Sequence, residues 1–224
     1  MDNRIRTLAV MLAVIAASSA RAATIDVIAA ATSIPLSPGG NGTLALMLRN
    51  VDVDAAELAV WQVALTVEPE PGALGTVEIS GFSTPVDYLF NGLSAFGIAH
   101  VFGNDLPSAF AVFSDALTSF PPGAILNGQT SVALINVTLT ASPAAAGAFR
   151  VLLPSVAGDF TDSFWIDPNQ QAPTTFGNNG PNSTLTERTI VMAQVSAVPE
   201  PCGVAAALGI IAFARCQNRP RRTQ

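Results

Sequence analysis

Apolar and polar residues alternate along several short stretches of this chain. This period of two is the sequence feature that most restricts which folds the chain can adopt. In residues 61–68 (WQVALTVE) every second side chain is large and apolar, and the residues between them are mostly small or polar. Residues 131–141 (SVALINVTLTA) repeat the pattern. Because successive side chains of a strand point to opposite faces, the alternation predicts strands with one buried face.

Six further segments are typical of strands of similar length: 24–31, 42–50, 76–82, 109–115, 148–153 and 185–195. Clusters rich in glycine and proline, such as 37–42 (SPGGNG) and 68–72 (EPEPG), separate the strands and predict turns. Residues 88–96 are the one helical candidate, and we expect them to form a loop across one end of the fold. About eight short strands joined by such turns predict an all-β domain over residues 23–197, an antiparallel β-sandwich or jelly roll.

The N-terminus has the three parts of a secretion signal. Arg4 and Arg6 precede the apolar run 8–17 (LAVMLAVIAA), and the small residues Ala20 and Ala22 follow it. A basic segment, a short apolar run and an A-x-A site define a cleavable signal peptide. We therefore predict that signal peptidase removes residues 1–22 and leaves Ala23 as the first residue. The alternative is a permanent membrane anchor, but the apolar run is about half of the ~20 residues that span a bilayer as a helix.

The C-terminus has the opposite arrangement. The motif Pro199-Glu200-Pro201 is followed by an uncharged segment, 202–214 (CGVAAALGIIAFA), and then by a basic tail. The arginines of this tail are Arg215, Arg219, Arg221 and Arg222. Arginines beside an apolar membrane segment stay on the cytoplasmic side, so the tail would lie inside the cell and the rest of the chain outside.

This order of motif, apolar helix and arginines resembles the PEP-CTERM sorting signal, here over residues 198–224. In that family the helix holds the exported protein in the inner membrane until an exosortase, a cysteine transpeptidase, cuts near the motif. The resemblance implies an exosortase-type enzyme as a processing partner, and a destination at the cell surface or outside the cell. The alternative, an ordinary tail anchor, explains the helix and the arginines but not the motif.

Charge and composition exclude several functions for residues 23–197. Three arginines stand against fourteen acidic residues there, a net charge of −11, and the chain contains no lysine. Such a surface repels phosphate and anionic lipid, so we expect neither nucleic acid as a partner nor a membrane contact other than the sorting tail. Both cysteines, Cys202 and Cys216, lie in that tail, and His100 is the only histidine. Disulfides, thiolate or histidine zinc sites and a Ser-His-Asp triad are therefore not expected.

The order of strands and turns is similar to that of cohesin-type and related carbohydrate-binding sandwiches. A glycine-rich turn at 40–42 precedes a strand that ends in Asn50, and the alternating strand after it runs into acidic and proline residues at 68–71. A turn at 127–129 then leads into the long strand 131–141. The resemblance implies a cohesin-like sandwich over about residues 24–195. No recognition residue can be matched, so no particular ligand is implied.

One acidic and aromatic stretch is the strongest candidate for a ligand site. Residues 159–169 (DFTDSFWIDPN) contain three carboxylates, Asp159, Asp162 and Asp167, beside three aromatic side chains. Oxygen ligands close together on a loop suit Ca²⁺, the one cofactor that the sequence suggests. Their spacing matches no defined calcium loop. The alternative is that the aromatic side chains fill the core while the aspartates form turns.

Two other groups are candidate sites. Trp61 and Trp165 are candidates for stacking on a sugar ring, because an exposed indole offers a flat apolar face. Asp52, Asp54 and Glu57 form a second acidic group after Asn50. An ordinary solvated loop is the interpretation that we favour for this group.

Together these features predict a non-enzymatic surface or extracellular-matrix protein whose sandwich mediates adhesion or assembly. Proteins with the sorting signal that this tail resembles are commonly linked with exopolysaccharide and biofilm, so extracellular polysaccharide or another surface protein is the expected partner. The alternative is a carbohydrate-binding module, and calcium dependence is a separate hypothesis. A hydrolase with paired carboxylates is a third hypothesis, but no segment fixes which group is the acid and which the base.

Overall fold

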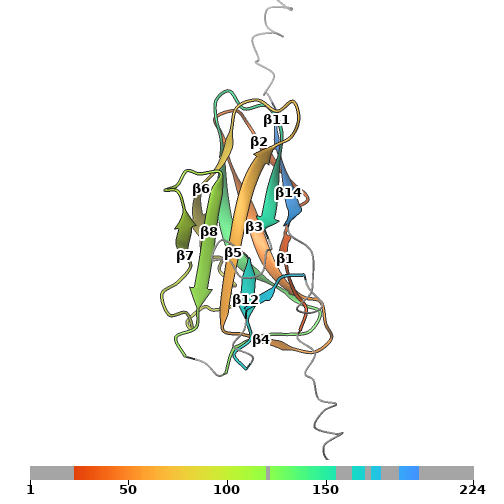
Figure 1. The fold of residues 1–224 in the computed structure, drawn as a ribbon, viewed down its shortest axis with the longest axis vertical. Coiled ribbons are helices and arrows are strands. Elements are labelled where there is room, and N and C mark those ends of the chain that lie inside the picture. The colour runs from red at the N-terminus through yellow and green to blue at the C-terminus, as the bar shows by residue number, and fades with distance from the viewer. Residues whose placement is uncertain (1–22, 120–121, 155–162, 170–172, 178–186, 197–224) are drawn as a thin grey trace, which may run out of the picture.

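The computed structural model describes residues 23–119, 122–154, 163–169, 173–177 and 187–196. Within these ranges the chain is all-β and contains no helix (Figure 1), so no described helix is long and apolar enough to cross a membrane. The prediction of an all-β domain is confirmed, and so is that of a loop at 88–96. The signal peptide predicted at 1–22 and the sorting signal predicted at 198–224 lie outside the described residues.

The smaller sheet has four antiparallel strands in the order β1-β3-β10-β6. Their bounds are β1, Ile25–Ala29; β3, Asn41–Asn50; β10, Ser131–Ala141; and β6, Val77–Ser83. Alternate residues of β3, Leu44, Leu46 and Leu48, are almost fully buried. The period of two therefore places one face of this sheet against the core, as the sequence predicts.

The larger sheet has eight strands arranged around β5, which lies at its centre. β8 and then β7 extend the sheet on one side of β5, and β12 and β11 pair with successive parts of β5 on the other. β11 continues to β14 and β2, and β12 continues to β13. The bounds are β2, Ser33–Leu36; β5, Val60–Pro69; β7, Ala99–Gly103; β8, Phe110–Ala116; β11, Gly147–Pro154; β12, Phe164–Ile166; β13, Pro173–Thr175; and β14, Glu187–Val195.

The prediction of a wholly antiparallel sandwich is wrong at one edge of the larger sheet. β2 pairs with β14 in parallel, with Ile34 opposite Ala193. β2 contains Pro35, which has no N–H to donate, and an edge strand is the place in a sheet where proline is tolerated. The chain therefore crosses between sheets here, because β1 and β3 on either side of β2 belong to the smaller sheet.

Side chains of both sheets fill the space between them, and the largest fully buried ones include Trp61, Phe113 and Phe149. The pattern of 61–68 predicted that Gln62 and Ala64 would lie on an exposed face. Both are buried, at 5% and 0% exposure. At Ala64 the chain before β12 closes against β5. The Ser163 hydroxyl accepts a hydrogen bond from the Ala64 N–H (2.9 Å) and donates one to the Ala64 carbonyl (3.3 Å).

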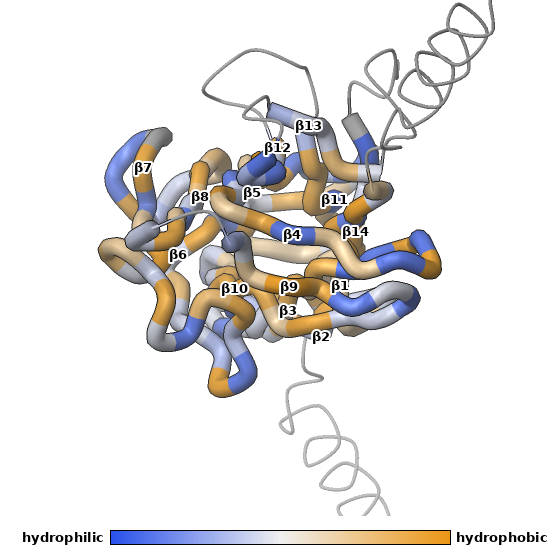
Figure 2. The backbone as a smooth tube through the Cα atoms, turned by 90° about the horizontal axis from the view of Figure 1, so that it is seen from below, coloured by the Kyte–Doolittle hydropathy of each residue, from blue (hydrophilic) through white to orange (hydrophobic). Residues whose placement is uncertain are grey.

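The two ends of the sandwich differ. At one end β4 (Ala56–Leu58) pairs with β9 (Ala124–Leu126), beside the loops 51–55 and 84–98. We call this the β4–β9 end, and Figure 2 looks directly at it. The chain enters there, since Ile25 is the partner of Asn50, and β14 runs to the opposite end (Figure 1). There the Ser196 N–H donates to the Leu36 carbonyl at 3.1 Å.

Candidate functional site

The two tryptophans that were candidates for sugar stacking are buried. Trp61 is 0% exposed and Trp165 is 1% exposed. They are direct cross-strand partners on β5 and β12, so both indoles belong to the core cluster. The stacking prediction is therefore wrong for both residues, because neither ring face reaches solvent.

The acidic and aromatic stretch 159–169 is described only from Ser163 onward, so Asp159 and Asp162 lie outside the described residues. Asp167 forms a turn, in which its Oδ1 accepts a hydrogen bond from the Asn169 N–H at 2.7 Å. With Trp165 in the core, the described part of the stretch fits the alternative of core aromatics and turn-forming aspartates. Elsewhere in the described ranges, no three His, Cys, Asp or Glu residues are grouped so as to hold a metal ion. Calcium binding by the whole stretch stays a prediction.

A buried polar network that the sequence did not reveal joins the core to the loop 84–98. Trp61 Nε1 donates to Tyr88 Oη at 2.8 Å, and Tyr88 Oη donates to Asp115 Oδ2 at 2.7 Å. Ser94 Oγ donates to Asp115 Oδ1 at 2.6 Å and accepts a hydrogen bond from the Gly97 N–H. The Ala116 N–H also donates to Asp115 Oδ1, at 2.7 Å. The network thus ties three points of the loop to β5 and β8.

Burial sets the chemistry of this network. Asp115 is 0% exposed and Tyr88 is 5% exposed. Burial raises the pKa of Tyr88 far above its usual value, and the hydrogen bond to Asp115 and the charge of its carboxylate raise it further. The phenol therefore stays a donor at physiological pH. Because the loop's own groups donate to both Asp115 oxygens, the arrangement fixes the loop against β8.

The titration of Tyr88 gives a direct test of the network, because it is the only tyrosine of the chain. In the unfolded chain a tyrosine ionises at about pH 10, so the contribution of Tyr88 to stability should be constant below that pH. Above it the unfolded state loses a proton that the folded state keeps, and the free energy of unfolding should fall by about 1.4 kcal/mol per pH unit. Near-ultraviolet absorbance should show tyrosinate only as the protein unfolds. Reversible ionisation near pH ~10 in the folded protein would contradict the buried hydrogen bond.

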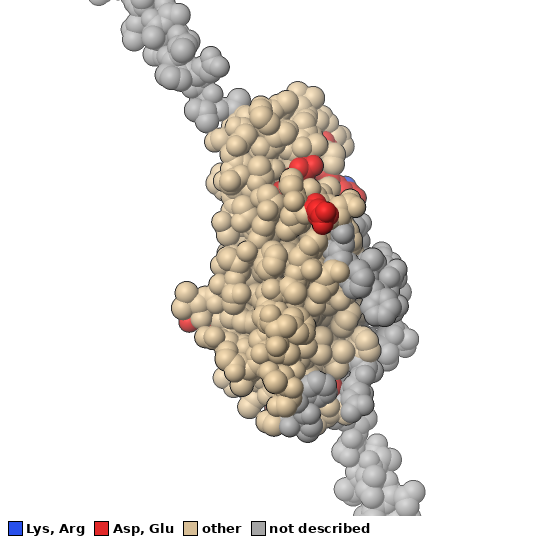
Figure 3. Space-filling view, turned by 90° about the vertical axis from the view of Figure 1, so that its left-hand side faces the viewer, with Lys and Arg blue, Asp and Glu red and all other residues tan. Residues whose placement is uncertain are grey.

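The described arginines all pair with carboxylates. Arg49 and Arg188 both bind Asp26, with Arg49 Nη2 3.2 Å from Asp26 Oδ2. Arg150 lies 3.0 Å from Glu68 and 2.9 Å from Glu70. Basic groups are almost absent from the face on the side of β6 and β7, where a few acidic groups are scattered over a largely uncharged surface (Figure 3). The acidic side chains outside these pairs therefore have no described cation beside them.

Exposed apolar side chains gather at the β4–β9 end. Among the described residues the large apolar side chains that are more than a third exposed are Val51, Val53, Leu74, Val86, Leu93, Phe96, Val101 and Ile125. All of these except Leu74 and Val101 belong to the loops or strands of the β4–β9 end. The loop 84–98 is fixed against its neighbours there, since the Thr118 N–H donates to the Leu93 carbonyl at 3.0 Å. Six of these eight exposed apolar side chains thus lie at one end of the sandwich.

No family model matches the chain, and no curated protein matches it either. Similar solved structures include CaCohA2 from Clostridium acetobutylicum, with a TM-score of 0.49 and 10% identity over 77% of this chain and 91% of that chain. The seventh ScaB type I cohesin from Pseudobacteroides cellulosolvens has a TM-score of 0.47 and 12% identity over 80% of this chain and 96% of that one. The Coh-OlpC-Doc435 cohesin–dockerin complex from Clostridium thermocellum has a TM-score of 0.46 and 12% identity over 80% of this chain and 99% of that chain. The solved structures similar to this chain thus include cohesin domains.

Proposed function

We propose that the chain is an exported, non-enzymatic bacterial surface or extracellular-matrix protein, sorted by an exosortase-type transpeptidase, and that its sandwich mediates adhesion or assembly through the β4–β9 end. The observation that carries this proposal is the position of the exposed apolar side chains. They gather at the end of the sandwich opposite to the end of β14. The sorting motif begins at Pro199, only a few residues after Ser196.

This polarity suits a tethered protein. A chain held through residues that follow β14 has the opposite end of its sandwich farthest from the point of attachment. The β4–β9 end would therefore face outward, with Leu93 and Phe96 on a loop that the Tyr88–Asp115 network fixes. A fixed loop loses little conformational entropy on binding, which favours association.

The same observations favour a protein partner over a glycan. The indoles expected to form a sugar-stacking platform lie in the core. The apolar side chains at the β4–β9 end are mostly aliphatic, and Phe96, at 62% exposure, is the aromatic among them. Aliphatic side chains gain free energy by packing against apolar side chains of a partner protein. The carbohydrate-binding alternative thus has no described tryptophan to support it.

Two leucines at opposite ends provide a matched test of this proposal. Leu93, at the β4–β9 end, is 53% exposed, and Leu74, at the other end, is 64% exposed. A leucine buried in an interface contributes about 1.5–3 kcal/mol, so Leu93→Asp should lower retention of the exported protein in the extracellular-matrix fraction about tenfold or more. Leu74→Asp makes the same change at the other end and should leave retention as it is. If the two variants were retained equally and had equal thermal stability, the β4–β9 end would not be the adhesive surface.

A further inference from the structure

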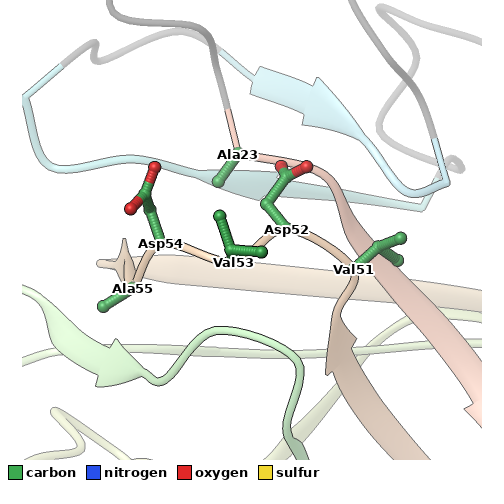
Figure 4. Close-up of a pocket in the computed structure, with 6 residues that line it drawn as sticks. All are labelled: Ala23, Val51, Asp52, Val53, Asp54 and Ala55. Atoms are coloured by element: carbon green, nitrogen blue, oxygen red, sulfur yellow. The ribbon is translucent and has the colours of Figure 1, made fainter.

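A small pocket lies at the β4–β9 end, where the described chain begins. Its volume is about 300 Å³, and it is lined by Ala23 and by the loop 51–55 (Figure 4). In that view Ala23 lies between the side chains of Asp52 and Asp54. The pocket is therefore acidic, and the first residue of the predicted mature chain forms part of its wall.

The backbone at the entry of β1 is fixed from both sides. The Thr24 N–H donates to Asp52 Oδ2 at 2.5 Å, and the Thr24 carbonyl accepts a hydrogen bond from the Val51 N–H at 2.9 Å. Only three covalent bonds separate the nitrogens of neighbouring residues, so the nitrogen of Ala23 lies within about 6 Å of Asp52 Oδ2. An opposite charge at that distance interacts appreciably with a carboxylate.

The loop that carries the two carboxylates is also held in place. Asn50 Oδ1 accepts a hydrogen bond from the Asp52 N–H at 3.0 Å, and Asn50 Nδ2 donates to the carbonyls of Asp54 and Leu126. The Gln129 N–H donates to the Asp52 carbonyl at 2.8 Å. Side chains and backbone thus build the pocket without a ligand, which is the condition for a preorganised site.

The negative charge of the pocket has no described cation to balance it. The described arginines pair with Asp26, Glu68 and Glu70, and the chain has no lysine. Within the described ranges no hydrogen bond or ion pair engages the Asp54 carboxylate, which is exposed. On β1 itself the charged group two residues beyond Thr24 is Asp26, and its two arginines already neutralise it.

We propose that this pocket is the binding site for the α-ammonium group that maturation creates on Ala23, held by the carboxylates of Asp52 and Asp54. The inference rests on the cleavage predicted in the proposed function. Signal peptidase hydrolyses the Ala22–Ala23 peptide bond; the oxygen of water joins the Ala22 carbonyl carbon, and the freed amine takes up a proton. Before cleavage the same nitrogen is an uncharged amide. Maturation therefore completes an ion pair that locks the start of β1 to the loop 51–55.

The absence of lysine makes the experiment direct, because the α-amino group is then the only amine of the mature protein. The full chain is exported from a bacterial host with its own signals, and its intact mass identifies the first residue. The rate of acylation by an amine-reactive reagent, followed against pH, then gives the titration midpoint of that amine. We expect a midpoint above that of the same protein in denaturant, and acylation about threefold slower at neutral pH than an unpaired amine would show.

Asp52→Asn is the informative variant, because its amide oxygen can still accept the Thr24 N–H while the charge is lost. Its midpoint should fall toward the denatured value. Asp87→Asn removes one charge from an exposed side chain on the loop 84–98 and should leave the midpoint unchanged. If the mature chain begins at Ala23 but its α-amino group has the same midpoint as in denaturant, both in the wild type and in Asp52→Asn, the pocket proposal is overturned. The proposal of export would still stand. A different first residue overturns the cleavage and the pocket proposal together, whereas no exported protein at all counts against the proposed function.

Discussion

Replacing Asp115 by alanine is expected to lower the free energy of unfolding by about 3 kcal/mol, because it leaves buried donors without an acceptor. Tyr88 Oη, Ser94 Oγ and the Ala116 N–H all donate to this carboxylate. In the alanine variant the buried Tyr88 hydroxyl would lose its acceptor, and so would the partly buried Ser94 and Ala116 donors, unless water enters. Equilibrium denaturation in urea, with the variant and the wild type compared at one pH, measures the difference.

Two further substitutions separate the network from the loss of charge alone. Asp115→Asn keeps an acceptor oxygen and nearly the same volume. It should therefore lower the free energy of unfolding by about 1 kcal/mol, less than Asp115→Ala does. Asp87→Ala removes a carboxylate from an exposed position on the same loop and should stay within about 0.5 kcal/mol of the wild type. If Asp115→Ala cost no more than Asp87→Ala, the buried network would contribute nothing to the stability of the fold.

Alternation in the sequence predicted the long strands well, because a period of two needs several residues to be visible. The strands that it missed are short. β4, β9, β12 and β13 have three residues each, and β7, which was also missed, has five. The pairing of β4, β9 and β12 depends on strands far along the chain. β2 was hidden by Pro35, which is typical of a turn until the strand is known to lie at an edge. Its parallel pairing with β14 joins segments too distant for any local pattern to reveal.

The same alternation contained information on the candidate site. Trp61 falls in register with Val63, Leu65 and Val67, so the pattern itself favoured the core over a sugar platform. Asp115 falls in register with Ala111 and Phe113, which are buried, as is Val112 between them. A carboxylate at a core position needs partners, and this was the one local signal of the network. Its partners Tyr88 and Ser94 lie on a loop, where no periodicity locates them.

A glycine in the turn between β9 and β10 lies close to the backbone of the loop 51–55. A Cβ atom on Gly128 would lie 1.9 Å from the Val53 carbonyl oxygen and 2.3 Å from the Val53 carbonyl carbon. Real Cβ atoms do not approach backbone atoms so closely, and no side-chain rotation relieves the overlap. Gly128→Ala should therefore push the turn and the loop 51–55 apart, at a cost of about 3 kcal/mol or more.

Gly81→Ala is the matched control, because it adds the same methyl group to a glycine of β6 that has room for it. The nearest atom to its Cβ would be Thr138 Cβ, at 3.9 Å. Glycine in a strand is about 0.5–1 kcal/mol less favourable than alanine, so this variant should be neutral or slightly more stable. Thermal unfolding of both variants measures the contrast. Similar melting temperatures would mean that the loop and the turn are not in contact as described.

The position of Gly128 also connects the stability of this end to the pocket at Ala23. The neighbouring Gln129 N–H bonds to the Asp52 carbonyl, and the Asn50 amide bridges Asp54 to Leu126, just before the turn. Separation of turn and loop would break these bonds and release the Asp52 side chain from Thr24. A Gly128→Ala protein that still folds should therefore show an α-amino titration midpoint close to that of Asp52→Asn, although both carboxylates remain. Gly81→Ala should keep the wild-type midpoint. This pair of results would show that the geometry of the loop, and not the number of acidic residues, binds the new N-terminus.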